Sequence, residues 1–273
     1  MLVLAGITWK EGLRRRLILA GLLLSLGFVL LYGLGVYYAF RETSGMGPFR
    51  ALAVYQLLSF GIFICSFLGT MLVVFSAAGM VNGEAESGLL QPVAARPVRR
   101  GQIVAGRYLG YGSLFVAYLV VLTGSVLVLT AVFADYSAPN PVGALVYLML
   151  QGLILLSLVS LLSTVLAPVP TGIVVFMMYG LSFIGGVVRQ IGLLLDNTTA
   201  ETVGVAMTYI MPTDSFFRMA LSGLAPRGTD RLIESFGPFG IATPPEVWPV
   251  VYGVLYLAVC VTLAMHIFSR KDL

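Results

Sequence analysis

Residues 136–188 read YSAPNPVGALVYLMLQGLILLSLVSLLSTVLAPVPTGIVVFMMYGLSFIGGVV, a run of 53 uncharged residues between Asp135 and Arg189. A single helix of this length would measure about 80 Å, because each residue adds about 1.5 Å, whereas the hydrocarbon core of a bilayer is about 30 Å thick. The run is therefore expected to form two helices joined by a turn. The turn is predicted at residues 167–170, Ala-Pro-Val-Pro, because proline lacks an amide donor and the residue before it avoids helical conformation.

The composition of the whole chain also indicates a membrane protein. Charged residues make up only 10% of the 273 residues, against about 25% in soluble proteins, and hydrophobic residues make up 59%. The chain has two cysteines and one histidine, Cys65, Cys260 and His266, which exclude a disulfide framework and a Cys/His zinc site built from this chain alone. We expect no metal site.

Four further intervals between charges are each long enough for one membrane-spanning helix. The expected fold class is an all-α integral membrane protein with six transmembrane helices in a single domain, 1–273. A signal peptide is the alternative explanation of the first apolar run, but the run is too long and its end offers no small-residue cleavage site. The expected spans are about 17–40, 52–80, 106–134, 143–167, 171–195 and 248–269.

The basic residues predict how the chain is oriented. Six spans put both termini on one side, together with the connection between the second and third spans. That side carries 10 of the 16 Lys and Arg residues but only four of the 12 acidic ones. By the positive-inside rule the termini are cytoplasmic, and the protein is a multi-pass protein of the cell membrane. The pI near 9.1 therefore reflects topology, and no nucleic-acid partner is expected.

Two segments outside the spans are expected to be helical. Residues 1–16 fit an interfacial elbow helix in the headgroup plane, although a short basic leader that only fixes orientation is the simpler alternative. Residues 196–247 form the largest outer segment, and we expect a short interfacial or re-entrant helix pair there. The elbow residues of interest are Trp9, Lys10, Glu11, Arg14 and Arg15.

The chain lacks the motifs of an ATPase or a hydrolase. Its only lysines, Lys10 and Lys271, do not belong to a phosphate-binding loop, and no zinc-protease or serine-hydrolase motif is present. No charge-free interval leaves a carboxylate in mid-membrane, which disfavours proton or sodium coupling. The chain is therefore expected not to be an enzyme by itself. An ATP-independent secondary carrier or lipid scramblase, and a membrane assembly or anchoring factor, remain alternatives to an ATP-driven transporter.

The cytoplasmic connection 81–105 places acidic residues before a basic cluster. The positive-inside rule alone can explain the arginines, and the acids can simply keep the helix exit hydrated. The order of features, however, resembles the corresponding loop in permease subunits of the ABC type-two transporter family. These features are Gly83-Glu84-x-Glu86-x-Gly88-x-Leu90, Arg96-Pro97-Val98-x-Arg100, Ile103 and Gly106-Arg107-Tyr108-x-Gly110.

The resemblance extends over essentially the whole chain: six spans, a basic N-terminal elbow, Pro212 after the fifth span and a tail ending Arg270-Lys271-Asp272-Leu273. Leu89 and Arg107 depart mildly from the family's pattern, where a hydroxyl residue and a lysine are frequent. Within the family, the chain is most similar to permeases grouped with multicopper-enzyme maturation and with antibiotic or lipid export.

The resemblance implies how the protein would work. The loop and the elbow would dock on a separate ATPase subunit, which binds the ATP and magnesium, so that this chain needs no cofactor. Two ATPases would pair with two permeases, identical or paralogous, in an exporter of an amphipathic or lipid-like substrate. The implied ATPase-coupling residues are Glu84, Glu86, Gly88, Leu90, Arg96, Pro97, Arg99 and Arg100.

Overall fold

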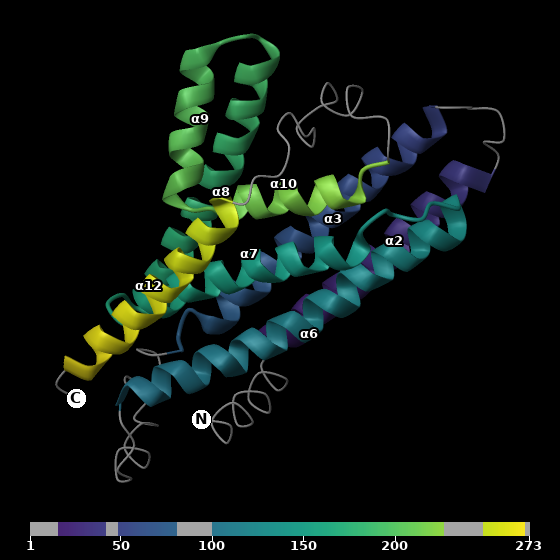
Figure 1. Cartoon of the computed structure of the whole chain (residues 1–273). Coiled ribbons are helices and arrows are strands. Elements are labelled where there is room, and N and C mark those ends of the chain that lie inside the picture. The colour runs from purple at the N-terminus through teal and green to yellow at the C-terminus, as the bar shows by residue number, and fades with distance from the viewer. Residues whose placement is uncertain (1–15, 42–48, 81–99, 227–247, 271–273) are drawn as a thin grey trace.

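The computed structural model describes residues 16–41, 49–80, 100–226 and 248–270, which contain eight helices and no strand (Figure 1). Six of the helices are long and apolar enough to cross a membrane, which confirms the predicted all-α fold with six spans. These are α2 (Arg16–Arg41), α3 (Phe49–Ala77), α6 (Arg100–Ala134), α7 (Pro141–Leu162), α8 (Pro168–Leu194) and α12 (Trp248–Arg270). Two shorter helices, α9 (Thr198–Ile210) and α10 (Thr213–Leu224), follow α8.

The long uncharged run is divided next to its paired prolines. Ala167 caps α8 in an extended conformation, with φ −63° and ψ 161°, and Pro168 and Pro170 occupy the first turn of α8, where backbone amides need no intrahelical partner. One predicted span is longer in the structure than in the prediction: α6 begins at Arg100, six residues before the predicted start at residue 106. Counting uncharged residues locates only the hydrocarbon-crossing part, whereas the helix continues past Arg107 towards the polar region.

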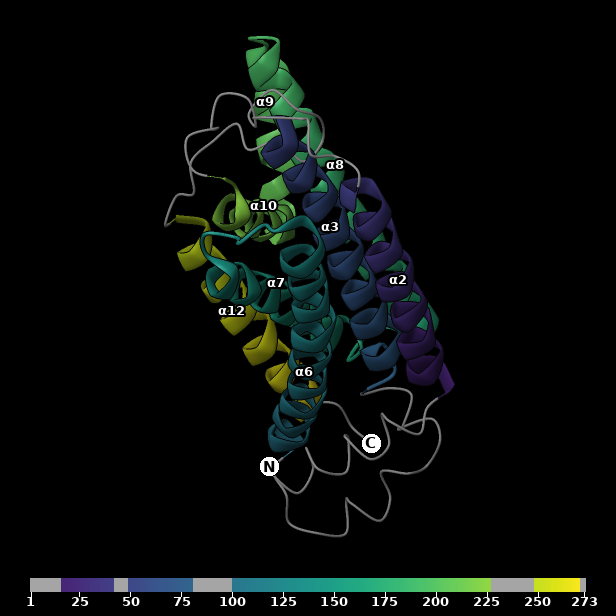
Figure 2. The same ribbon diagram turned by 90° about the vertical axis from the view of Figure 1, so that its right-hand side faces the viewer.

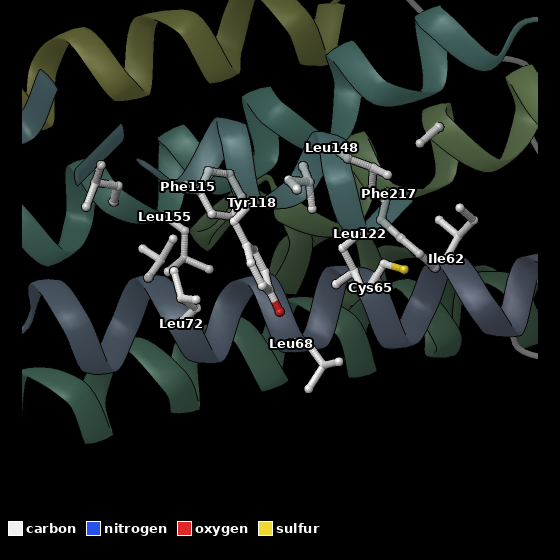
Figure 3. Packing of buried hydrophobic residues seen from close by; sticks show 14 of the residues in the cluster. Ile62, Cys65, Leu68, Leu72, Phe115, Tyr118, Leu122, Leu148, Leu155 and Phe217 are labelled. Atoms are coloured by element: carbon white, nitrogen blue, oxygen red, sulfur yellow. The ribbon is translucent and has the colours of Figure 1, made fainter. Parts of the chain in front are cut away.

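The core lies between α3, α6 and α7. Residues of α3 such as Tyr55, Ile62 and Cys65 are at most 1% exposed. Figure 3 shows the contact: Ile62, Cys65 and Leu72 of α3 lie towards Phe115, Tyr118 and Leu122 of α6, with Leu148 and Leu155 of α7 alongside. Apolar packing of this kind supplies the contacts that lipid chains would otherwise make.

The helices α2 and α12 lie on the outside of this core (Figure 2). Large aliphatic side chains on α2 are exposed, for example Leu23 (70%) and Leu31 (71%). Two side-chain hydrogen bonds join α2 to α6: Ser25 with Tyr118 at 2.5 Å, and Tyr32 with Thr130 at 2.8 Å. In a bilayer the exposed leucines face lipid.

One end of the bundle gathers the end of α3, the starts of α6 and α8 and the end of α12 (Figures 1 and 2). Gly101 of α6 lies against Met265 of α12, and Gly172 of α8 lies against Val74 of α3. Met80 and Arg100, which flank the connection 81–99, therefore lie at the same end of the bundle as the C-terminal end of α12.

Hydrogen bonds join the elements at the opposite end. Arg50 of α3 donates to the carbonyl of Ala134, the last residue of α6, at 3.4 Å. Tyr136 donates to the carbonyl of Leu224 in α10 at 2.6 Å, and the amide of Asn140 donates to Gly223 at 2.9 Å. The segment between α6 and α7 is thereby fixed to the end of α10.

The helix α9 folds back along the second half of α8 to form a hairpin (Figure 1). Glycines make this close approach possible, because a Cβ at Gly204 would lie 2.4 Å from the Arg189 amide nitrogen and 2.6 Å from the Gly185 carbonyl oxygen. A pair of helices was predicted within 196–247, and α9 and α10 are such helices. Their placement as interfacial or re-entrant elements stays a prediction.

Candidate functional site

Most of the predicted coupling residues lie outside the described part of the chain. This applies to Glu84, Glu86, Gly88, Leu90, Arg96, Pro97 and Arg99, and to the elbow residues Trp9, Lys10, Glu11, Arg14 and Arg15. Arg100 is described and begins α6. The two anchors of the connection are joined directly, because the Arg107 guanidinium in α6 donates a hydrogen bond to the Met80 carbonyl just after α3. A displacement of the connection would therefore act on α3 and α6 together.

A buried polar cluster lies where α8 meets α10. The Arg218 Nε donates to Asp214 Oδ2 at 2.7 Å, and its Nη1 donates to Gln190 Oε1 at 2.8 Å. The side chains of Asp214 and Arg218 are only 2% and 15% exposed. The cluster joins one turn of α10 to the last third of α8.

The α8 backbone at Gly186 leaves room for the Asp214 carboxylate. Asp214 lies directly over Gly186, where an added Cβ would come within 1.9 Å of Oδ2. Ser182, one turn earlier on α8, donates to the Met211 carbonyl at 2.5 Å and accepts from the Asp214 amide at 3.3 Å. Burial raises the pKa of Asp214, while the neighbouring cations Arg218 and Arg189 oppose that shift. The two arginines thus favour the ionised form of Asp214 against the effect of burial.

Uncharged polar groups continue from the cluster towards the middle of the bundle. Tyr179, one turn below Ser182 on α8, lies beside Ser66 and Thr70 of α3 and Gln151 of α7. Gln151 Nε2 donates to Ser66 Oγ at 2.9 Å, and these residues are at most 7% exposed. This set of side chains links α3, α7 and α8 within the membrane-spanning region without introducing a charge.

Half-buried aromatic rings cover the outer side of the same region. Phe63 of α3 lies 5.0 Å from Phe183 of α8 and 6.1 Å from Phe217 of α10, measured between ring centroids. Phe67 of α3 lies 6.0 Å from Phe176 of α8. Phe217 is buried, and we call the four half-buried rings, Phe63, Phe67, Phe176 and Phe183, the aromatic face. This face offers apolar contact area, and the hydroxyl and amide groups behind it are buried.

The described residues contain no group of three or more His, Cys, Asp or Glu side chains placed to hold a metal ion. In these residues both Cys65 and Cys260 are free and buried.

Sequence reasoning did not find the polar cluster. The structure buries Arg218 against Gln190 of α8. The signals were present as an Asp and an Arg four residues apart, and as the adjacent Gly185 and Gly186 followed by Arg189 and Gln190. These signals could not be connected without knowing that α10 folds back onto α8.

A family model described as "ABC-2 family transporter protein" matches residues 2–273. The chain belongs to this family. It is thus related to the permeases of ATP-binding cassette transporters, which span the membrane and work with an ATPase subunit. The six apolar helices agree with a multi-pass permease. A search of curated proteins gives no match.

Proposed function

We propose that this permease is the membrane subunit of an ATP-driven exporter for an amphipathic or lipid-like substrate. The observation that carries the proposal is the match of the ABC-2 transporter family to residues 2–273, together with six membrane-spanning helices. Two permeases, identical or paralogous, pair with two separate ATPase subunits, which bind the ATP and magnesium. The complex resides in the cell membrane with both permease termini in the cytoplasm, as the distribution of arginines favours.

ATP binding closes the ATPase dimer, which pushes on the connection 81–105 and on residues 1–16. The bond from Arg107 to the Met80 carbonyl supports this route, because it ties both ends of the connection to one another. α3 and α6 contain 29 and 35 residues, so each carries a displacement across the whole membrane. At the far end of α3, Tyr55 donates to the Leu221 carbonyl of α10 at 3.4 Å. The push thereby reaches α10.

The chemistry of the α3 and α8 surface supports an amphipathic cargo. The aromatic face supplies apolar contact area, and the polar groups buried behind it, Ser66, Thr70 and Tyr179, are uncharged. A small inorganic ion would need charged or multiple oxygen ligands instead. The absence of charge among these groups favours a molecule with an apolar body and few polar groups.

Charge reversal in the connection tests the coupling. We expect Glu86→Lys and Arg100→Glu each to abolish co-purification of the ATPase or stimulation of its activity, while membrane insertion is unchanged. Arg41→Glu is the matched control, since Arg41 is an exposed arginine at the opposite end of the bundle. Unchanged coupling in both connection variants would contradict the assignment.

Reconstitution separates the proposal from its main alternative. A secondary carrier or scramblase would move substrate in liposomes that contain this chain alone. The proposed permease should move substrate only when the ATPase and ATP are added. A stable partner without any flux would instead favour an assembly or anchoring factor.

A further inference from the structure

A cavity of about 390 Å³ lies between α2 and α6, within their membrane-spanning parts. Its floor consists of buried side chains, including Ile18 (2% exposed), Leu72 (8%) and Tyr118 (9%). A second cavity of about 220 Å³ lies on the other side of α2, against α3, and shares these three residues with the first. α2 is therefore flanked by unfilled space on both sides near its first turns.

The larger cavity opens sideways into the bilayer. Its rim carries Leu22, Leu26 and Val121, whose side chains are 41%, 58% and 69% exposed. These residues belong to the lipid-facing surfaces of α2 and α6, so the opening faces hydrocarbon rather than water. A cavity lined by aliphatic side chains does not hold water stably, because water would lose its hydrogen bonds there.

The hydrogen bonds of the three hydroxyl groups in the lining determine which kind of ligand the cavity can bind. Ser25 Oγ lies 2.7 Å from the Gly21 carbonyl and 2.5 Å from the Tyr118 hydroxyl, and when it donates to Gly21 the tyrosine hydroxyl is the donor to Ser25. Ser125, the third hydroxyl in the lining, donates to the Val121 carbonyl at 2.7 Å. Each hydroxyl proton is thus already used.

The lining consequently has nothing to offer a charged or carbonyl-bearing ligand. It contains no charged side chain, and none of its hydroxyls has a free proton to donate to a phosphate, a carboxylate or an ester carbonyl. An uncharged, mostly aliphatic lining of this kind is complementary to a hydrocarbon chain. Figure 3 shows Tyr118 reaching from α6 to α3 and lying between Leu72 and Leu68, and both Tyr118 and Leu72 line the cavity.

We propose that this cavity binds one acyl chain of a bilayer phospholipid, with the headgroup outside the cavity. The cavity volume lies within the size range of small-molecule sites. An acyl chain that enters from the bilayer would give the lining side chains dispersion contacts on their open side. A bound chain would add packing between α2 and α6 to their two side-chain hydrogen bonds. This proposal does not depend on an ATPase or on transport, so it can fail independently of the proposed function.

Photo-crosslinking tests the proposal directly. The full-length protein is reconstituted alone in phosphatidylcholine nanodiscs that contain a phosphatidylcholine with a mid-chain diazirine, and the labelled peptides are mapped by mass spectrometry. Label should concentrate on residues 18–29 and 114–125 relative to the lipid-facing helix α12. Ala117 lines the cavity, and Ala117→Trp should reduce that label about tenfold or more, because a bound chain would lose the burial of several methylene groups.

Two further variants keep the result interpretable. Ala258→Trp adds the same ring to an exposed position on α12 and should leave the label at α2 and α6 unchanged. Ala117→Leu fills part of the cavity with less risk of misfolding and should reduce the label to an intermediate degree. Label that is no higher at these segments than on α12, or that survives Ala117→Trp, would overturn the proposal.

Discussion

Arg218 donates to Asp214 at 2.7 Å from one turn further along α10, and Asp214 in turn lies over the bare backbone of Gly186 in α8. The pair is therefore both a bond within α10 and the contact that sets α10 against α8. Gln190 completes the arrangement by accepting from the same guanidinium. A buried ion pair gains little over apolar packing, but removing one member leaves an uncompensated charge. This asymmetry makes the pair suitable for testing how α10 is positioned.

Asp214→Ala should lower the free energy of unfolding by about 3 kcal/mol, since Arg218 would remain buried without its carboxylate. Thermal or denaturant unfolding of the purified protein in detergent measures the change. The double variant Asp214→Ala/Arg218→Met removes the stranded charge and should recover a large part of the loss. Equal stability of the single and double variants would show that a stranded Arg218 charge is not the cause of the loss.

Gly204→Ala should separate α9 from α8, because the new methyl group would lie 2.4 Å from the Arg189 amide nitrogen, and backbone atoms cannot move aside as side chains do. Overpacking of this kind costs about 1–3 kcal/mol. Gly180→Ala on α8 is the control, since its Cβ would meet nothing within 4 Å. Proteolytic accessibility of the α8–α9 hairpin should rise only in the Gly204 variant, and a rise in both variants would contradict the packing argument.

The sequence was sufficient to predict the spans, because the cost of burying charge in lipid is large and acts on each residue separately. Pro168 and Pro170 likewise located the break between α7 and α8 through local backbone chemistry. The position of Asp214 over Gly186 could not be predicted in this way, since it depends on α10 folding back across residues 195–212 onto α8. The cavity beside Tyr118 was equally inaccessible, because a void is a property of packing between helices.

The orientation of the bundle can be measured with single cysteines. Ser137 and Val165 are exposed and lie in the turns at opposite ends of α7, and the native Cys65 and Cys260 are buried, so background labelling should be low. We expect a membrane-impermeant maleimide to label Ser137→Cys in intact cells and Val165→Cys only after permeabilisation. The reverse pattern would place the termini outside and contradict the proposed direction of ATPase docking.

Replacing Phe67 in the aromatic face should weaken the interaction with substrate without affecting assembly. Phe67→Ala removes a half-buried ring that contacts Phe176, and we expect a higher concentration of amphipathic substrate to be needed for half-maximal stimulation of ATPase activity. Phe75→Ala is the matched control, since Phe75 is an exposed phenylalanine on the same helix and outside the aromatic face. An equal shift in both variants would argue against a substrate role for the aromatic face.

Arg107 offers a way to separate docking of the ATPase from transmission of its movement. Its guanidinium bonds to the Met80 carbonyl, so it joins α3 to α6 without belonging to the connection that is proposed to touch the ATPase. Arg107→Ala should therefore leave co-purification of the ATPase intact, while substrate stimulation of ATP hydrolysis falls several-fold because α3 and α6 no longer move together. Gln102→Ala, at an exposed position on the preceding turns of α6, should change neither quantity. Loss of co-purification in Arg107→Ala would instead place Arg107 in the docking surface, and unchanged stimulation would show that the two helices need no such bond to move as one.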